Sequence, residues 1–398
     1  MFWVEVIFWV SLGLVFYTHI GYGLLIWVLT RIKKLFVKNA VPAILPADEL
    51  PAVTYIVAAY NEEAWISEKI ENSLRLQYPS EKLLLWFVTD GSNDNTPAIV
   101  AEYASKMPDR IQLFHQPERR GKIAAVERVM EQVRTPVTVF SDANTKVNPE
   151  AIHNIVRHYR DEKVGAVAGE KRIHMDAAEE ASAAGEGIYW KYESFLKQLD
   201  NEFYSTIGAA GELFSIRTEL YRPVEPDTLI EDFVMTMRIA MGGYKIAYEP
   251  AAYAVENGSA SVKEELKRKV RIAAGALQAI YRLRALLNPF KYGRLSFQYI
   301  SHRMLRWTLA PLALPVILIS NIVLAGSGQP LYQVLLGLQV AFYLLALAGW
   351  LLEKRKVRIK ILFIPYYFLV MNYAMFAGAI RLLKGQQSVL WEKAARAK

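Results

Sequence analysis

The sequence predicts an α/β domain with a mostly parallel sheet, flanked toward both ends of the chain by transmembrane and interfacial helices. Two observations carry this prediction. From residue 50 to about residue 290, short apolar segments alternate with segments of helical periodicity, which is typical of parallel strands joined by helical connections. The longest apolar runs lie outside that stretch, and 53% of all residues are hydrophobic, a high fraction for a soluble protein.

The first segment predicts a membrane anchor over residues 1–30. Residues 2–29 are long enough to cross a bilayer and carry one charged side chain, Glu5. The stretch is too long for a signal peptide and lacks a basic start. A basic linker follows over 31–49, and its lysines and arginine favour a cytoplasmic position.

The central region predicts alternating strands and helices. Residues 52–60 and 82–90 are almost entirely apolar, as expected for strands buried on both faces of a parallel sheet. In chain order, the expected elements are a strand at 52–60, a helix at 61–77, a strand at 82–90, a helix at 97–107, a strand at 110–116, a helix at 122–133 and a strand beginning at 136.

Polar clusters follow three of these strands. They are Tyr60, Asn61 and Glu62, then Asp90, Gly91 and Ser92, then Asp142, Ala143 and Asn144. One such cluster is explained equally well by ordinary backbone capping. Because ligands of open parallel sheets bind at the carboxyl ends of strands, three clusters together indicate a binding site. Carboxylates at this edge of a basic chain, with net charge +8, suit Mg²⁺ or Mn²⁺ held between protein and phosphate.

Composition excludes several other sites. The chain has no cysteine, so disulfides, thiolate metal sites and cysteine nucleophiles are ruled out. Its six histidines show no ligand spacing on a helix face, which disfavours zinc. The basic balance alone would suit nucleic acid, an anionic bilayer or a phosphate-bearing substrate. We expect no nucleic-acid partner, because no stripe of interleaved aromatic and basic residues is present.

Six segments occur in a fixed order: "IVAAYNEE", "TDGSNDNT", "RRGKIAA", "FSDANT", "GAAGELFSIR" and "LIEDFVMTMRIAMGGY". In this order they resemble the membrane-bound family-two glycosyltransferases with the GT-A fold, in the branch that includes cellulose, chitin, hyaluronan and poly-N-acetylglucosamine synthases. The resemblance covers residues 50 to about 285 and implies a GT-A-type nucleotide-sugar-binding domain over 50–260.

The resemblance implies a role for each matching residue. The nucleotide-sugar donor would be bound by Ala58, Tyr60, Glu62, Asp90, Lys122, Asp142, Arg268 and Arg271. The metal would be bound by Asp142 and Asn144, where Asn144 stands in place of the family's second acid. An amide oxygen can bind Mg²⁺ or Mn²⁺ but brings no charge, so we expect the diphosphate to hold much of the cation.

The resemblance also implies the catalytic pair. Asp232 would be the base that takes the acceptor hydroxyl proton, with Glu231 beside it. The acceptor pocket would be formed by Gly208, Ala209, Gly211 and Glu212. Processive members carry Gln-x-x-Arg-Trp, whereas residues 268–272 read "RKVRI" here. The stacking Trp is therefore lost, and Trp190 is a candidate to replace it as an acceptor contact.

The last part of the chain predicts membrane helices. Residues 261–304 mix basic and apolar side chains at helical spacing, as in interfacial helices. The C-terminal region 305–384 holds candidate spans at 305–325, 331–352 and 361–380, before a basic tail at 385–398. A full third crossing would export that tail against the charge rule. Either the last segment is re-entrant or interfacial, or the tail is an exception to the rule.

Together these features predict an integral protein of the bacterial inner or plasma membrane type, with a cytoplasmic catalytic domain. The expected reaction is inverting transfer from a UDP-sugar to a growing cell-surface or secreted polysaccharide. The alternative is transfer of a single sugar to a lipid-linked acceptor. The expected partners are the nucleotide-sugar donor, a glycan or lipid-linked acceptor and the bilayer.

Overall fold

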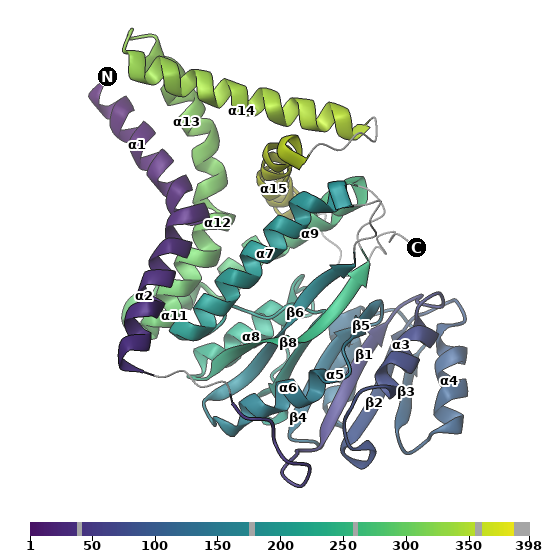
Figure 1. Cartoon of the computed structure of the whole chain (residues 1–398). Coiled ribbons are helices and arrows are strands. Elements are labelled where there is room, and N and C mark those ends of the chain that lie inside the picture. The colour runs from purple at the N-terminus through teal and green to yellow at the C-terminus, as the bar shows by residue number, and fades with distance from the viewer. Residues whose placement is uncertain (38–41, 175–179, 258–261, 355–359, 386–398) are drawn as a thin grey trace. The chain divides into compact units, whose positions relative to one another are not determined.

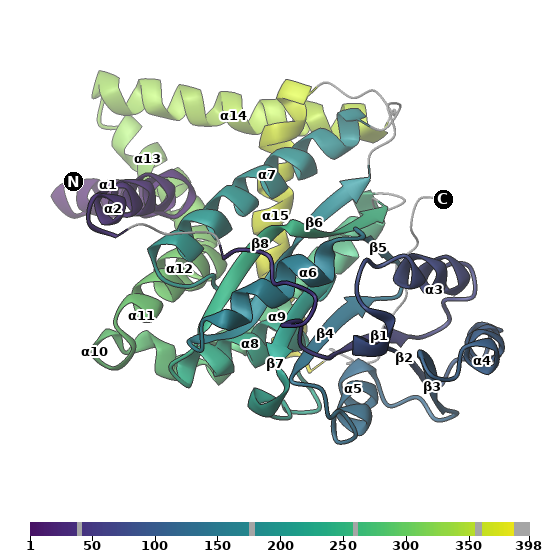
Figure 2. The ribbon, with the colours of Figure 1, turned by 60° about the horizontal axis from the view of Figure 1, so that its bottom comes forward.

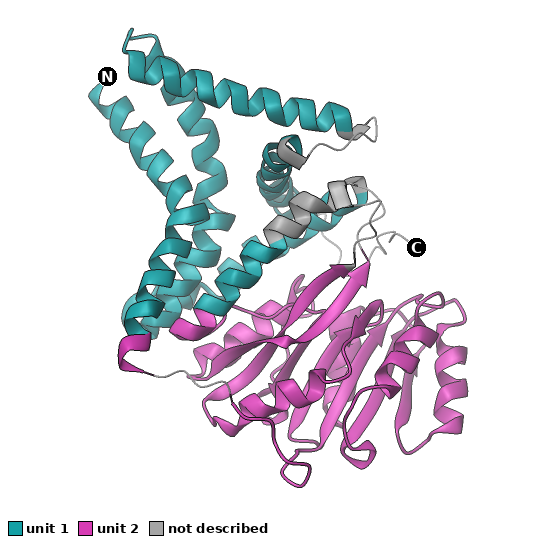
Figure 3. Ribbon diagram, in the orientation of Figure 1, with its two compact units in different colours: residues 1–33, 175–199, 258–387 teal, residues 34–174, 200–257, 388–398 magenta. Residues whose placement is uncertain are grey.

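The computed structural model describes residues 1–37, 42–174, 180–257, 262–354 and 360–385 (Figure 1). The chain divides into two compact units (Figure 3). Unit 1 consists of residues 1–33, 175–199 and 258–387, and unit 2 consists of residues 34–174, 200–257 and 388–398.

Unit 2 is built on a single sheet, which has eight strands in the described part of the chain, in the order β3-β2-β1-β4-β7-β6-β8-β5. The strands are β1 (Val53–Ala59), β2 (Leu83–Asp90), β3 (Ile111–Gln116), β4 (Val137–Asp142), β5 (Thr145–Val147), β6 (Val164–His174), β7 (Leu213–Arg217) and β8 (Lys245–Asn257). Strands β3, β2, β1 and β4 pair in parallel, as do β6 and β8. The predicted α/β region with a mostly parallel sheet is confirmed. Strand β7, antiparallel to both its neighbours, was not among the expected elements.

Helices cover both faces of this sheet (Figure 2). They are α3 (Ile66–Leu74), α4 (Thr96–Lys106), α5 (Lys122–Met130), α6 (Ala151–Val156) and α8 (Glu231–Met241). Every residue of β1 is buried, because side chains that alternate along a strand meet a packed layer on each side. Tyr55 and Val57 share a core with Ile70 of α3 and Ile152 of α6, while α5 packs on β1 and β2.

Unit 1 is helical in its described residues. Its helices are α1 (Phe2–Phe16), α2 (Tyr22–Phe36), α7 (Glu180–Phe203), α9 (Val262–Arg282), α10 (Pro289–Tyr292), α11 (Arg294–Gln298), α12 (Leu305–Trp307), α13 (Leu309–Ala325), α14 (Pro330–Lys354) and α15 (Lys360–Leu383), of which α2 and α7 end in residues assigned to unit 2. A π-helical turn at Tyr17–Gly21 joins α1 to α2. Phe8 of α1 packs with Ile317 and Leu324 of α13 and with Tyr332 of α14.

Among the residues that the structure describes, three helical stretches are long and apolar enough to cross a membrane, at Phe2–Phe36, Pro330–Leu352 and Leu362–Leu383. These match the predicted spans at 2–29, 331–352 and 361–380. The remaining predicted span, 305–325, is part of a helix pair, Arg294–Trp307 and Leu309–Ala325, bent by 51°. The pair is a further candidate span, and the bend falls at Thr308, whose backbone leaves the helical region.

Most of helix α7, up to residue 199, groups with the terminal helices in unit 1, and the domain bounds predicted over 50–260 stay a prediction. Glu193 of α7 is 2% exposed. Its Oε1 lies 2.5 Å from Nη2 of Arg303, and its Oε2 lies 3.2 Å from Nη1 of Arg306. A buried carboxylate needs such charged partners. Because both arginines belong to the C-terminal helices, these ion pairs tie α7 into unit 1.

Helix α9 packs closely on α15 within unit 1. The contact uses small residues, since a Cβ added at Gly378 would come 2.7 Å from the Cβ of Ala273. Small residues allow two helix backbones to approach closely. One face of α9 is therefore covered by α15, and the predicted interfacial position of residues 261–304 stays a prediction.

Candidate functional site

Strands β1, β2 and β4 end together at one edge of the sheet, and their register brings predicted site residues close. Ala58 of β1 pairs with Val88 of β2 on one side and with Asp142 of β4 on the other. A small open pocket lies there, lined by Ala58, Ala59, Tyr60, Val88, Asp90, Arg119, Gly121, Lys122 and Ala125. The structure thus brings together four of the residues predicted to bind the nucleotide, namely Ala58, Tyr60, Asp90 and Lys122.

Asp90 organises the wall of this pocket. Its carboxylate accepts hydrogen bonds from the backbone N–H groups of Arg120, at 3.0 Å, and Gly121, at 2.6 Å. Arg119, the residue before this pair, lies directly against Gly91, since a Cβ added at Gly91 would lie 2.6 Å from the Cα of Arg119. The Arg119 guanidinium stacks 3.7 Å from the centre of the Tyr60 ring. The Asp90 carboxylate therefore fixes the "RRGK" loop that presents Lys122.

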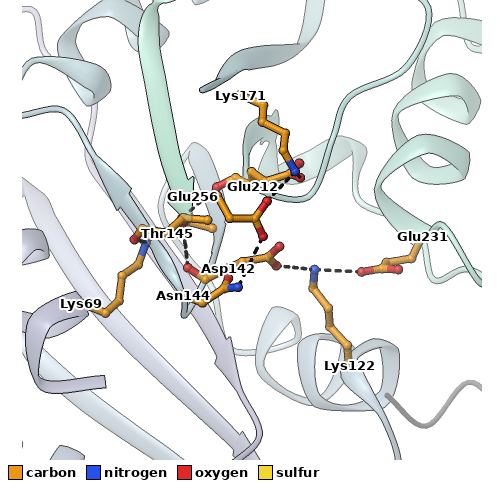
Figure 4. A network of polar contacts seen from close by, with 10 residues as sticks. Lys69, Lys122, Asp142, Asn144, Thr145, Lys171, Glu212, Glu231 and Glu256 are labelled. Carbon is orange, nitrogen blue, oxygen red and sulfur yellow. Dashed lines mark hydrogen bonds and ion pairs between the residues drawn. The ribbon is translucent and has the colours of Figure 1, made fainter. Parts of the chain in front are cut away.

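Lys122 joins two carboxylates at the mouth of the pocket (Figure 4). Its Nζ lies 2.9 Å from Asp142 Oδ1 and 3.0 Å from Glu231 Oε1. Burial alone would lower the pKa of Lys122, but the charges of Asp142, Glu231 and Asp232 hold it above its ordinary value. Burial raises the pKa of Asp142, although Lys122 acts in the opposite direction. Lys122 is therefore a permanent positive charge between the sheet edge and α8.

Asp232 lies in the first turn of α8, next to Glu231. Burial, followed by the neighbouring Glu231 charge, raises the pKa of Asp232 to about 7. A Cβ added at Gly211 would lie 3.2 Å from Lys122 Nζ, 3.4 Å from Asp232 Oδ2 and 3.8 Å from Asp142 Oδ1. The absent side chain of Gly211 thus leaves room where these three charged groups converge.

The "GAAGE" loop is fastened to the start of α8. Gly208 has φ +78°, and a Cβ there would come 2.1 Å from the Phe233 ring, so glycine is required on both counts. The backbone N–H of Ala209 donates to Thr236 Oγ1 at 3.1 Å, and that hydroxyl donates to the Asp232 carbonyl at 2.7 Å. The predicted acceptor residues Gly208, Ala209 and Gly211 therefore lie against the predicted catalytic pair.

Lys69 was not predicted, although it supports the loop that carries Asp142. Its Nζ donates to Ser141 Oγ at 2.7 Å and to the Thr145 carbonyl at 2.9 Å. Burial lowers its pKa to about 7, opposed by Asp142. A signal existed in the sequence, since Ile66, Lys69, Ile70 and Ser73 share one face of a helix. A lysine on the apolar face of a helix indicates a buried partner.

Lys171 and Glu256 were also missed. Lys171 of β6 forms ion pairs with Glu212 and, at 2.5 Å, with Glu256 Oε2 of β8. The Asn144 side-chain nitrogen donates to Glu256 Oε1 at 3.4 Å (Figure 4). A lysine and a glutamate in separate strands carry no local signal, because their partners lie far away in the sequence. The predicted residues Glu212 and Asn144 are thus linked through Lys171 and Glu256.

Of the other predicted residues, Glu62 follows strand β1 in unit 2, and three belong to unit 1. Glu62 is 6% exposed, and its backbone N–H donates to Thr96 Oγ1 at 2.8 Å. Trp190, Arg268 and Arg271 belong to unit 1, where Lys269 Nζ lies 5.4 Å from the Trp190 ring centre. Because Asp142 and Asp232 belong to unit 2, the roles predicted for these three residues stay predictions.

The donor set at this edge fits a hard divalent cation. The carboxylates in the network are Asp142, Glu212, Glu231, Asp232 and Glu256, and they outnumber the ammonium groups paired with them, Lys122 and Lys171. Oxygen-rich, negatively charged sites of this kind suit Mg²⁺ or Mn²⁺. Within the described residues, no group of three or more His, Asp or Glu side chains is arranged to hold an ion. A divalent cation bound by Asp142 and Asn144 would therefore need other ligands for most of its coordination sphere.

Comparison with known proteins identifies what this chain is similar to. Residues 54–224 match the model of the family described as "Glycosyl transferase family 2". A poly-beta-1,6-N-acetyl-D-glucosamine synthase from Staphylococcus aureus is 26% identical over 59% of this chain and 57% of its own length. A beta-monoglucosyldiacylglycerol synthase from Nostoc is 25% identical over 78% of this chain and 66% of its own length. The chain thus spans less than two thirds of both relatives.

A solved structure is similar over almost the whole chain. It is a mannosyltransferase from Pyrobaculum calidifontis in complex with GDP-Man and Mn²⁺. The TM-score is 0.70 at 24% sequence identity, covering 96% of this chain and 100% of the other. At this identity the likeness establishes a common fold.

Proposed function

We propose that the chain is a glycosyltransferase of family 2, whose model matches residues 54–224, and that it transfers a sugar from a UDP-sugar to a growing polysaccharide at a membrane, with inversion at the anomeric carbon. The observation that carries the proposal is the convergence of Lys122, Asp142 and Asp232 around Gly211. It supplies an acid–base group and a fixed positive charge beside the pocket lined by Ala58, Tyr60 and Asp90.

Asp232 is suited to act as the general base. A base with a pKa near the working pH exists partly as carboxylate and still holds a proton well once it is transferred. The pKa of Asp232, raised to about 7, meets this requirement. In the proposed reaction the acceptor oxygen forms its bond to the anomeric carbon from the face opposite the diphosphate. Its proton passes to Asp232, and the bond to the diphosphate oxygen breaks.

Lys122 would stabilise the departing diphosphate. Its charge is maintained by the surrounding carboxylates, and a fixed positive charge aimed at developing negative charge lowers the barrier without reorganisation. Asp142 and Asn144 would hold the divalent cation, which supplies further neutralisation of the leaving group. The complex of the mannosyltransferase with GDP-Man and Mn²⁺ supports both a nucleotide-sugar donor and a metal.

Two observations favour an alternative function with a different acceptor. Arg268 and Ile272 stand where processive members carry Gln and Trp, so the stacking platform for a long glycan is missing. The Nostoc relative, which matches 78% of this chain, is named for a glucosyldiacylglycerol. The alternative function is therefore the addition of a single sugar to a lipid acceptor, without polymerisation.

The proposed location is a bacterial inner or plasma membrane with unit 2 in the cytoplasm. Three helical stretches and one bent pair supply the candidate spans. The basic linker after the first span supports the orientation, because basic segments are retained in the cytoplasm.

The test uses the full chain, purified in detergent, with a panel of UDP- and GDP-sugars and either Mn²⁺ or Mg²⁺. Mass spectrometry sizes the products on glycan primers and on diacylglycerol. A ladder of lengthening glycans supports polymerisation, whereas one added sugar on the lipid supports the alternative. NMR of the new linkage reports inversion or retention. A retained anomeric configuration, or transfer from none of the donors, contradicts the proposal.

A further inference from the structure

Asn144 occupies the place of an acid at the strand end, and its surroundings explain the exchange. The residue is half-buried, and its Nδ2 donates to Glu256 Oε1 at 3.4 Å. A carboxylate at position 144 would instead face Glu256 without a proton between them, which is unfavourable at this distance. The amide at position 144 and the carboxylate at position 256 therefore form a complementary pair.

Backbone pairing fixes where Glu256 lies. Strand β5 begins directly after Asn144, and its first residue, Thr145, is opposite Glu256 of β8. Glu256 is 3% exposed, so its carboxylate cannot turn away into solvent. Its other oxygen, Oε2, lies 2.5 Å from Nζ of Lys171, which is also 3% exposed. Glu256 is thus held from both sides, with one oxygen on an ammonium group and the other on the Asn144 amide.

This arrangement fixes the orientation of the Asn144 side chain. An amide has one oxygen and one nitrogen, so binding the nitrogen to Glu256 turns the oxygen away from that carboxylate. An acceptor on the nitrogen also polarises the amide and makes its oxygen a better ligand. Groups that orient metal ligands in this way are commonly worth about 10- to 100-fold in metal affinity.

We propose that Glu256, fixed by Lys171, is a positioning residue that orients the Asn144 amide as a ligand of the divalent cation and supplies the negative charge missing at position 144. The inference rests on the proposed function, since it concerns the cation bound with the nucleotide. It assigns a role to a strand, β8, that contributes no residue to the motifs around Asp142.

The test exchanges the two side chains. In Glu256→Gln, the side chain keeps one oxygen, which accepts a hydrogen bond from either Lys171 or Asn144. The new NH₂ group of the glutamine then faces the other of these two donors, where no hydrogen bond can form. In the double variant Asn144→Asp/Glu256→Gln, the introduced glutamine can donate from its nitrogen to the new carboxylate while its oxygen accepts from Lys171. The double variant keeps both the hydrogen bonds and the net charge of the natural pair, in exchanged positions.

Mn²⁺ binding to the full chain in detergent is measured by electron paramagnetic resonance, with UDP and separately with GDP. Glu256→Gln should weaken Mn²⁺ affinity about tenfold, and the double variant should return it to within about threefold of the natural protein. Glu249→Gln is the matched control, because Glu249 lies on the same strand, is 2% exposed and pairs with Arg157. It should lower the Tm without changing Mn²⁺ affinity.

Asn144→Ala keeps the test decisive if Glu256→Gln does not fold. It removes the amide and leaves the Lys171–Glu256 ion pair intact, so Mn²⁺ affinity should fall, while the Tm should fall by no more than the loss of one hydrogen bond to Glu256 explains. Unchanged Mn²⁺ affinity in Glu256→Gln or Asn144→Ala, or a double variant that regains only its Tm, overturns the inference and leaves the proposed function standing. Failure of the natural protein to bind Mn²⁺ with either nucleotide overturns the metal step of the proposed function as well.

Discussion

Lys122 Nζ lies 2.9 Å from Asp142 Oδ1, at the tip of β4, and 3.0 Å from Glu231 Oε1, at the start of α8. One ammonium group therefore connects the donor side of the site to the helix that carries Asp232. The two carboxylates come from segments 89 residues apart in the sequence (231 − 142). A substitution of Lys122, Asp142 or Glu231 should therefore affect the site both at the tip of β4 and at the start of α8.

The rate of transfer should rise with pH through about 7, because Asp232, with its pKa raised to that value, accepts a proton only as the carboxylate. Asp232→Asn should lower kcat by about 100-fold or more and abolish this rise, while the Kd for the nucleotide changes little. Steady-state rates from pH 5.5 to 8.5 and calorimetric titration with UDP measure both. Full turnover in Asp232→Asn would eliminate it as the base.

Thermal stability should show the opposite pH dependence. The folded pKa of Asp232 lies above the ordinary value of 3.8, so its contribution is fully present below about pH 4 and is lost as the pH rises through 7. Asp232→Asn removes that loss, and its Tm relative to the natural protein should improve between pH 5 and pH 8. A difference in Tm that does not change over this range would show that Asp232 ionises normally.

Gly211→Ala should impair catalysis more than folding. The new Cβ would lie 3.2 Å from Lys122 Nζ, the mobile end of a long side chain, so Lys122 must shift from its place between Asp142 and Glu231. We expect kcat/KM to fall about tenfold, or about 1.4 kcal/mol. Gly337→Ala is the control, since no atom lies within 4 Å of its added Cβ. Equal activity of the two variants would contradict a crowded site at Gly211.

Lys69→Met should loosen the loop that carries Asp142. It removes the donors to Ser141 Oγ and the Thr145 carbonyl, and unpaired buried groups cost about 1–3 kcal/mol each. The Tm should fall and the KM for the donor should rise. Lys146→Met is the control, because Lys146 is 57% exposed and pairs with the exposed Glu68. A similar fall in Tm and rise in KM in both variants would contradict a specific role of the buried Lys69 in supporting this loop.

Glu193→Gln should destabilise unit 1. Removing this charge leaves the Arg303 and Arg306 guanidinium groups, which lie within 3.2 Å of it, without their carboxylate. Breaking a buried ion pair from one side costs about 3–5 kcal/mol. Thermal unfolding in detergent measures the loss. Glu264→Gln, which affects the pair with the 58% exposed Lys267, should change the Tm little, and a similar drop in both variants would argue against a specific role of Glu193.

The sequence by itself determined the sheet edge and the candidate membrane spans. The runs 52–60 and 82–90 are apolar at nearly every position, and only a strand buried on both faces suits that pattern. Local polarity changes then marked Asp90 and Asp142 at the strand ends, and the resemblance to family-two glycosyltransferases added Asp232 to the candidate site. Such features are encoded by neighbouring residues, so they can be read without knowing which strands lie side by side.

Only the tertiary structure decided the charged network beneath that edge. Lys171 and Glu256 look like ordinary surface residues in the sequence, because a lone charge is normally solvated. The helical spacing that marks Lys69 as buried does not say which residues it contacts. The partners are 76 residues away for the Lys69–Thr145 contact and 85 residues away for the Lys171–Glu256 pair. Strand pairing buries Lys171 and Glu256, and the packing of α3 buries Lys69, so each of these groups needs an opposite charge or a hydrogen bond. The same pairing places Glu256 against Asn144 and so gives the amide at the strand end its orientation.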